Sequence, residues 1–162
     1  MKITEAIAMQ LIDVFQGGNW TDVDFKHTLQ DINWHEAVTI TKASPNTIAG
    51  ILYHTGFYNW VIQQRLKGEN PEINSSNGFD VPEVHNERDW KELKQNVFQS
   101  AQELAQMIDT YPEERLMLPI VEDASSVYKS VHGVIEHAHY HLGQIVILKK
   151  LIREQKSNGS SL

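Results

Sequence analysis

Four long stretches of this 162-residue chain place apolar side chains at intervals of three and four residues. This spacing gathers the apolar side chains on one face of an α-helix, and it constrains the fold more than any other feature of the sequence. Residues that start or stop helices lie at the boundaries: Gly17 and Gly18 follow the first stretch, Ser44 and Pro45 begin the second, and Gly68 follows it. We therefore predict helices over residues 4–15, 44–67, 86–111 and 129–155.

Strand patterns are weak by comparison. The run 37–41 contains β-branched residues and fits a short strand, a loop or a helical turn. The segment 69–85 is rich in Asn, Ser, Pro and Gly, so we expect an irregular loop there. The pattern as a whole indicates an all-α protein, with a four-helix bundle over residues 1–155 as its single domain. We expect residues 156–162 to form a disordered tail; periodicity alone leaves the helix directions open.

The charge and the cysteine content of the chain exclude several functions. The formal net charge is -7, from 14 Lys and Arg against 21 Asp and Glu. A nucleic-acid-binding protein usually has a basic face, so we expect no nucleic-acid partner. No apolar run approaches the roughly 18 residues of a membrane span, and the N-terminal residues do not resemble a signal peptide. The chain has no cysteine, which excludes a thiolate metal site and fits a cytoplasmic protein.

Three histidines lie within five residues of the last predicted helix. Successive helical residues turn by about 100°, so His137 and His141 lie about 40° apart on one face. That face is apolar, because it also carries Val134, Leu148 and Ile152. His139 lies on the opposite, polar face, which also carries His132, Glu136 and Lys150. The pattern therefore predicts one buried pair of histidines and two exposed ones.

Two imidazoles one helical turn apart can chelate a metal ion. Burying both costs free energy unless each has a partner, and bonds to carbonyls or to each other are the alternative to a metal. A third ligand must come from elsewhere in the chain. His54 is the best candidate, because it lies on an apolar face in the middle of the second predicted helix; a core histidine is the alternative. His27, His35 and His85 lie in loops or poorly defined segments and are weaker candidates.

The residues around these histidines resemble the DinB-like superfamily of metal-binding helical bundles, to which YfiT-like proteins belong. One part of the resemblance is His54, followed by Trp60 and by Arg-Leu-Lys-Gly at 65–68. The other is the string His-x-x-x-His-x-Gly-Gln, formed here by His137, His141, Gly143 and Gln144. Helix order and chain length agree over nearly the whole chain. The resemblance implies an up-up-down-down bundle with long crossovers, and frequently a homodimer.

The resemblance also implies a function. It implies that His54, His137 and His141 bind one metal ion, with open positions for water or a substrate, and that known members handle low-molecular-weight thiols. Such a site suits zinc or nickel first, and iron or manganese as well. We predict an enzyme, a thiol transferase or a hydrolase, whose metal activates a thiol or water for attack on a small substrate. The alternative is a non-catalytic bundle that binds a metal or a small molecule.

Three further residues are candidates for the surroundings of the metal. Tyr58, Arg65 and Gln144 could orient a ligand or meet the substrate from the wall of the cavity. For each of them, an ordinary packing or surface position is the alternative.

Overall fold

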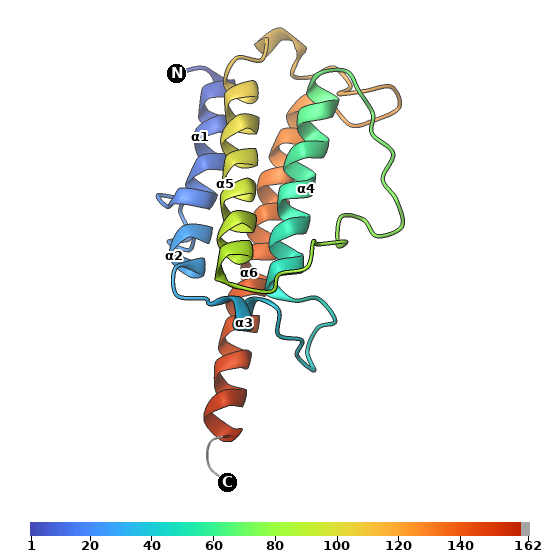
Figure 1. The fold of residues 1–162 in the computed structure, drawn as a ribbon. Helices are drawn as coiled ribbons and strands as arrows, with labels where there is room; N and C mark the ends of the chain where they lie inside the picture. The colour runs from blue at the N-terminus through green and yellow to red at the C-terminus, as the bar shows by residue number, and fades with distance from the viewer. Residues whose placement is uncertain (160–162) are drawn as a thin grey trace.

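The computed structural model describes residues 1–159, and helices are the regular secondary structure of this part of the chain (Figure 1). The prediction of an all-α protein is confirmed. The helices are α1 (Ile3–Gln16), α2 (Phe25–Leu29), α3 (Trp34–Ala37), α4 (Ile48–Leu66), α5 (Glu87–Asp109), the short 3-10 helix η1 (Glu113–Arg115) and α6 (Val127–Gly159).

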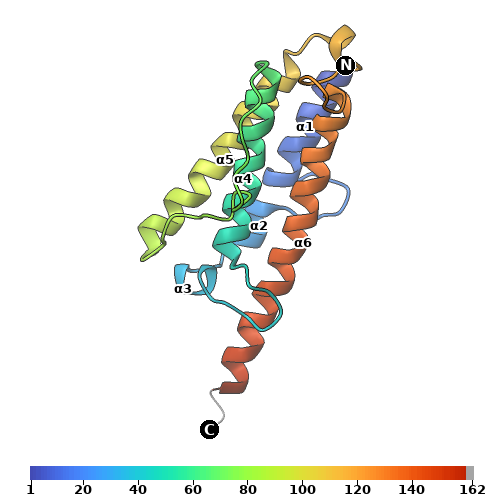
Figure 2. The same ribbon diagram turned by 90° about the vertical axis from the view of Figure 1, so that its right-hand side faces the viewer.

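The four long helices α1, α4, α5 and α6 lie side by side (Figure 1). α4 packs against α5 and α6, and α1 packs against the same two helices. α4 and α5 run in one direction, whereas α1 and α6 run in the other (Figures 1 and 2). This order differs from the expected up-up-down-down arrangement. The reason is that only the segment between α4 and α5 returns along the length of the helices, while the other two connections join neighbouring helix ends.

Side-chain caps explain where the helices begin. The predicted start of the second long helix at Ser44 and Pro45 is wrong, because Thr47 is the N-cap of α4 and its side chain accepts a hydrogen bond from the backbone N–H of Gly50. The predicted start of the third helix near Asn86 is confirmed. The Asn86 side chain accepts hydrogen bonds from two N–H groups in the first turn of α5.

Two short helices that were not predicted lie between α1 and α4. α2 begins after Asp24, whose side chain accepts a hydrogen bond from the N–H of His27. α3 begins after Asn33, which forms a reciprocal capping box with Glu36. The run 37–41, for which a strand, a loop and a helical turn were all open, contains the end of α3 followed by loop.

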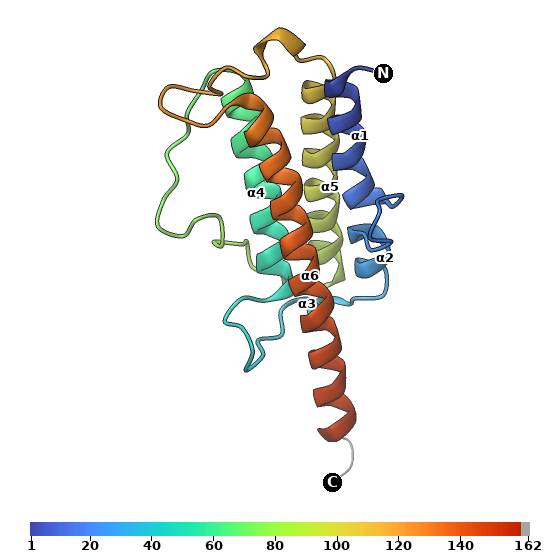
Figure 3. The same cartoon turned by 180° about the vertical axis from the view of Figure 1, so that it is seen from behind.

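The last helix is longer than expected. α6 reaches Gly159, so residues 156–159 of the expected tail are helical, and residues 160–162 lie outside the described part of the chain. Figure 3 shows α6 continuing beyond the ends of the other long helices.

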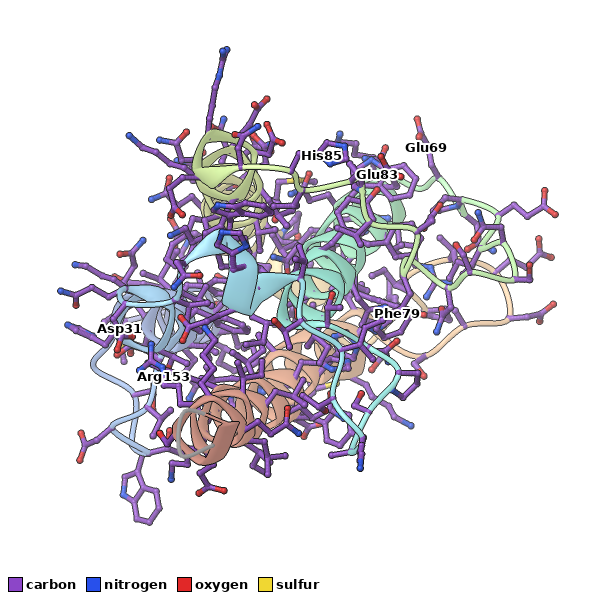
Figure 4. The ribbon with its side chains drawn as sticks, turned by 60° about the horizontal axis from the view of Figure 1, so that its bottom comes forward. Asp31, Glu69, Phe79, Glu83, His85 and Arg153 are labelled. Carbon is purple, nitrogen blue, oxygen red and sulfur yellow. The ribbon has the colours of Figure 1, made fainter. Side chains whose placement is uncertain are left out.

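Ion pairs hold α6 where it leaves the other helices. Arg153 binds Asp31 at 2.8 Å and Glu36 at 3.0 Å, and Figure 4 shows Asp31 and Arg153 next to each other. Hydrogen bonds from Lys149 and Arg153 lower the pKa of Asp31 to about 2. The segment that contains α2 and α3 is therefore fastened to α6 by charged contacts.

The core lies between the four long helices. Each of them contributes fully buried aliphatic side chains, such as Leu11, Leu52, Leu104 and Ile145. Their removal from water is the main force that holds the helices together. Trp90 of α5 is also fully buried, and its indole N–H donates to the backbone oxygen of Ile32 at 2.8 Å. None of the helices in residues 1–159 combines the length and the apolarity needed to cross a membrane.

Candidate metal centre

The packing of α4 against α6 brings together the three histidines that were predicted as ligands. His54 lies in the middle of α4, and His137 and His141 lie one turn apart on α6. One ring nitrogen of each lies within 4.8 Å of the others. His54 and His141 are buried, and His137 is half-buried. The cluster therefore joins two helices, and His54 and His137 are 83 positions apart in the chain.

The same ring atom of each histidine, Nε2, points to a common position. The Nε2 atom of His137 lies 3.0 Å from that of His54 and 3.0 Å from that of His141. Two imidazole nitrogens bound to one tetrahedral zinc ion are about 3.3 Å apart, given a Zn–N distance of about 2.0–2.1 Å. The spacing of the three rings is therefore close to that of ligands around a single metal ion.

Hydrogen bonds at the opposite ring atom, Nδ1, fix the protonation of two of the rings. Nδ1 of His54 donates to the backbone oxygen of Asn77 at 2.7 Å. Nδ1 of His141 donates to the side-chain oxygen of Gln144 at 2.7 Å. A neutral ring that carries its proton on Nδ1 has a lone pair on Nε2. His54 and His141 therefore both present lone pairs to the common position.

Three neutral rings held in this way cannot all form hydrogen bonds with one another through Nε2. The Nε2 atom of His137 can carry one proton and donate it to either His54 or His141, which leaves the other lone pair without a donor. Nδ1 of His137 is buried and has no hydrogen-bond partner among the described residues. A metal ion accepts all three lone pairs at once. The donor set of the cluster therefore fits a metal better than it fits hydrogen bonding alone.

Burial keeps the three imidazoles neutral. Burial, with the nearby His141 and His54, lowers the pKa of His137 to about 3. Burial also lowers the pKa of His54 and of His141 below the usual value of a histidine. The neutral form of histidine is the form that binds metals, so the cluster is ready to bind a cation at neutral pH without first losing protons.

A tight turn in the loop after α4 holds His54. Asn77 and Gly78 both have positive φ, at 51° and 73°, and the N–H of Phe79 donates to the backbone oxygen of Ser76 at 2.9 Å. These are the features of a type I′ turn, for which Asn-Gly is the preferred sequence. The turn directs the backbone oxygen of Asn77 at His54 and stacks the Phe79 ring on the imidazole, with 4.0 Å between ring centroids. Figure 4 shows Phe79 beside α4 and α6.

The other predicted residues take different positions. Gln144 contacts His141 through the hydrogen bond described above. Tyr58 lies against the cluster, with its ring centroid 4.7 Å from that of His137, and its hydroxyl donates to the side-chain oxygen of Asn77 at 2.6 Å. Arg65 is not brought to the cluster: it lies three turns further along α4, about 16 Å away along the helix axis, and donates to Asn70.

Asn77 and Phe79 were not predicted as functional residues, because the sequence of residues 69–85 predicts only an irregular loop. The Asn77-Gly78 dipeptide was the available signal, since it favours a tight turn of defined geometry. Nothing in the sequence showed that this turn would face His54.

The remaining histidines stay outside the cluster and have other contacts. His27 binds Asp24 at 2.8 Å, and His85 binds Glu83 at 3.0 Å. His139 bonds the backbone oxygen of Ile135 through Nδ1 at 3.1 Å. The rings of His35 and His132 lie against Trp34 and Tyr128.

A protein-family model matches most of the chain. The family model described as the DinB superfamily matches residues 19–145, which include all three clustered histidines and Gln144. Among curated proteins and among solved structures, none matches the chain. The matched range covers more than half of the sequence and contains α4, α5 and the part of α6 that carries the cluster. The chain therefore belongs to the DinB superfamily.

Proposed function

We propose that this protein binds one divalent metal ion through His54, His137 and His141, and that it is an enzyme that uses this ion in catalysis. The observation that carries the proposal is the convergence of three Nε2 atoms, two of them held as lone-pair donors by Asn77 and Gln144. We propose zinc or nickel as the first metals to test, and iron or manganese as the next, because neutral imidazoles suit all four.

The proposed reaction is the activation of a thiol or water for attack on a small substrate, which gives thiol transfer or hydrolysis. When bound, a divalent metal lowers the pKa of a thiol or water that it coordinates. Within residues 1–159 the cluster consists of three histidines, and the sequence contains no cysteine, so a thiol has to arrive as a low-molecular-weight substrate. Gln144 and the Asn77 turn keep two rings in place while the substrate binds and leaves, and Phe79 covers one face of His54.

Metal binding is tested first, by elemental analysis of protein purified without a polyhistidine tag. We expect about one metal ion per chain in the wild type and a large loss in His137→Ala. The matched control is His139→Ala, which removes a histidine of the same helix that lies outside the cluster. Equal metal content in the wild type and in His137→Ala would contradict the proposal.

Catalysis is tested next on the metal-loaded protein. Bacillithiol or glutathione is supplied with a small electrophile, and loss of the thiol is followed over time. Turnover that depends on both the metal and His137 supports a thiol transferase; turnover without the thiol supports a hydrolase. The second candidate function is a non-catalytic metal- or small-molecule-binding bundle. Stoichiometric metal with no turnover of either kind favours it.

We further propose a four-helix bundle that forms a homodimer in the cytoplasm, as the family resemblance implies. Sedimentation velocity of the untagged protein tests the dimer: a single species with the mass of one chain would contradict it. Fractionation of the source cells tests the location.

A further inference from the structure

A cavity separate from the histidine cluster lies between α4, α5 and the segment that leads into α5. Its volume is about 600 Å³, and none of the three clustered histidines lines it. Small-molecule sites usually have volumes of about 300–1,000 Å³, so the cavity is large enough for a compact organic ligand.

The inner walls of the cavity are apolar. Tyr53, Phe57 and Trp60 line it from α4, and the ring centroids of Phe57 and Trp60 are 5.7 Å apart. Leu93 and Val97 line it from α5. These side chains would bury the carbon skeleton of a ligand and bring three aromatic rings next to it.

The rim of the cavity is acidic. Glu83, Asp89 and Glu92 line it, and no lysine or arginine does. The Glu92 carboxylate has no hydrogen bond or ion pair with any described residue, so its charge is available to a ligand. Glu83 pairs with the exposed His85 on the segment that leads into α5, and Figure 4 shows both beside α4. The cavity therefore combines aromatic residues, whose ring faces can attract cations, with carboxylates at its mouth.

We propose that this cavity binds a small organic cation with an apolar body, such as an aryl-alkyl amine. The apolar body packs between the aromatic side chains of α4 and the aliphatic side chains of α5, and the ammonium group lies between the aromatic faces and Glu92. An anion of the same size would face three carboxylates, and no lysine or arginine lines the cavity to offset their charge. This inference goes beyond the proposed function and does not depend on metal binding.

Calorimetric titration of the full chain with three matched probes tests the charge preference. The probes are 3-phenylpropylamine, 3-phenylpropanol and 3-phenylpropionate, which share a skeleton and differ in charge. We expect the amine to bind about tenfold more tightly than the alcohol, because it adds cation–π and ion-pair contacts to the same apolar burial. The carboxylate should bind most weakly. Equal affinity for the amine and the alcohol would overturn the proposal.

Two variants test the location of the site. Glu92→Gln should weaken amine binding about fivefold, the effect of losing one exposed charge contact, and leave alcohol binding unchanged. Trp60→Leu should weaken the binding of both the amine and the alcohol, and the loss of affinity should be larger for the amine. The matched control is Glu122→Gln, which makes the same charge change in an exposed loop residue that does not line the cavity. An equal loss in Glu122→Gln would show a general charge effect and overturn the assignment.

The competing occupant of this face is a second copy of the chain. Sedimentation velocity on the wild type and on Trp60→Leu distinguishes a small ligand from a second chain as the occupant. Unfolding midpoints of both proteins show whether the variant folds. A dimer that Trp60→Leu disperses would mean that the partner covers the cavity, and would overturn the proposal. The proposal is supported if the association state stays the same in Trp60→Leu and when the amine is added to the wild type.

Discussion

Nδ1 of His54 lies 2.7 Å from the backbone oxygen of Asn77. This hydrogen bond joins α4 to the loop that follows it and returns along its length. The bond fixes which nitrogen of His54 carries the proton, so the loop determines how the imidazole presents its other nitrogen. Because the acceptor is a backbone atom, the identity of the Asn77 side chain matters less than the path of the turn. That path depends on Gly78.

Gly78→Ala should weaken zinc binding and destabilise the fold. Gly78 has φ of +73°, which strains any residue with a Cβ, and a Cβ there would overlap the Phe57 ring. Either the ring or the turn that holds His54 therefore has to move. We expect a loss of about 1–3 kcal/mol in the free energy of unfolding, measured in urea. Zinc affinity, measured by competition with a chromophoric chelator, should fall about tenfold.

The control for this substitution is Gly68→Ala. Gly68 also has positive φ, at +88°, but nothing lies within 4 Å of a Cβ built there. This variant should lose some stability through backbone strain and keep the zinc affinity of the wild type. An equal loss of affinity in both variants would show that the turn has no specific effect on His54.

Gln144→Leu should lower zinc affinity while the fold persists. The side-chain oxygen of Gln144 holds His141 in the form that presents its Nε2 lone pair, and leucine has a similar size without an acceptor. Loss of such a partner typically costs about 10–100-fold in metal affinity. The same competition assay measures it. Gln155→Leu, an exposed change on the same helix, should leave the affinity unchanged.

Zinc should stabilise the metal-free protein against heat. A ligand present at about a hundredfold excess over its dissociation constant adds about 2.7 kcal/mol to the free energy of unfolding. For a chain of this length, that corresponds to a rise in Tm of roughly 5–10 °C. Differential scanning calorimetry before and after chelation measures the change. A similar rise in His141→Ala would place the zinc at another site.

The ion pairs between Asp31 and α6 should make a small contribution to stability that is lost in acid. Lys149 and Arg153 lower the pKa of Asp31 in the folded protein to about 2, from the ordinary value of 3.8. A lowered pKa means that the stabilisation is complete above about pH 4 and disappears as the pH falls towards 2. Asp31 is largely exposed, so we expect less than about 1 kcal/mol.

Urea unfolding of the wild type and of Asp31→Asn from pH 5 to pH 2.5 isolates this contribution. The difference in unfolding free energy between the two proteins should be largest at pH 5 and shrink as the pH falls. A difference that does not change with pH would show that the Asp31 charge contributes nothing to stability.

The regular parts of the fold could be predicted because local spacing determines them. α5 shows this clearly: its apolar stripe and the Asn86 cap are both readable in the sequence. The start of α4 could not be read in the same way. Ser44-Pro45 and Thr47 are all acceptable helix starts, and the choice depends on which side chain reaches a free N–H.

The histidine cluster was predictable only in part. His137 and His141 share a helix face by geometry alone, whereas His54 was predicted from its place on an apolar face of another helix, where a core histidine was the alternative. The resemblance to the DinB-like superfamily, which the family match confirms, supported the choice of His54. Asn77 and Phe79 lie in the loop after α4, where no periodic pattern exists. Their contacts with His54 follow from the path of that loop, which local preferences do not determine. The role of all these residues in binding a metal stays a prediction.

The 83 residues that separate His54 from His137 also order events during protein synthesis. The ribosome makes α4 and α5 before it makes either histidine of α6, so a growing chain that ends before α6 contains only His54 of the three clustered histidines. The proposed metal site is therefore complete only in a chain that has been made as far as His141 of α6.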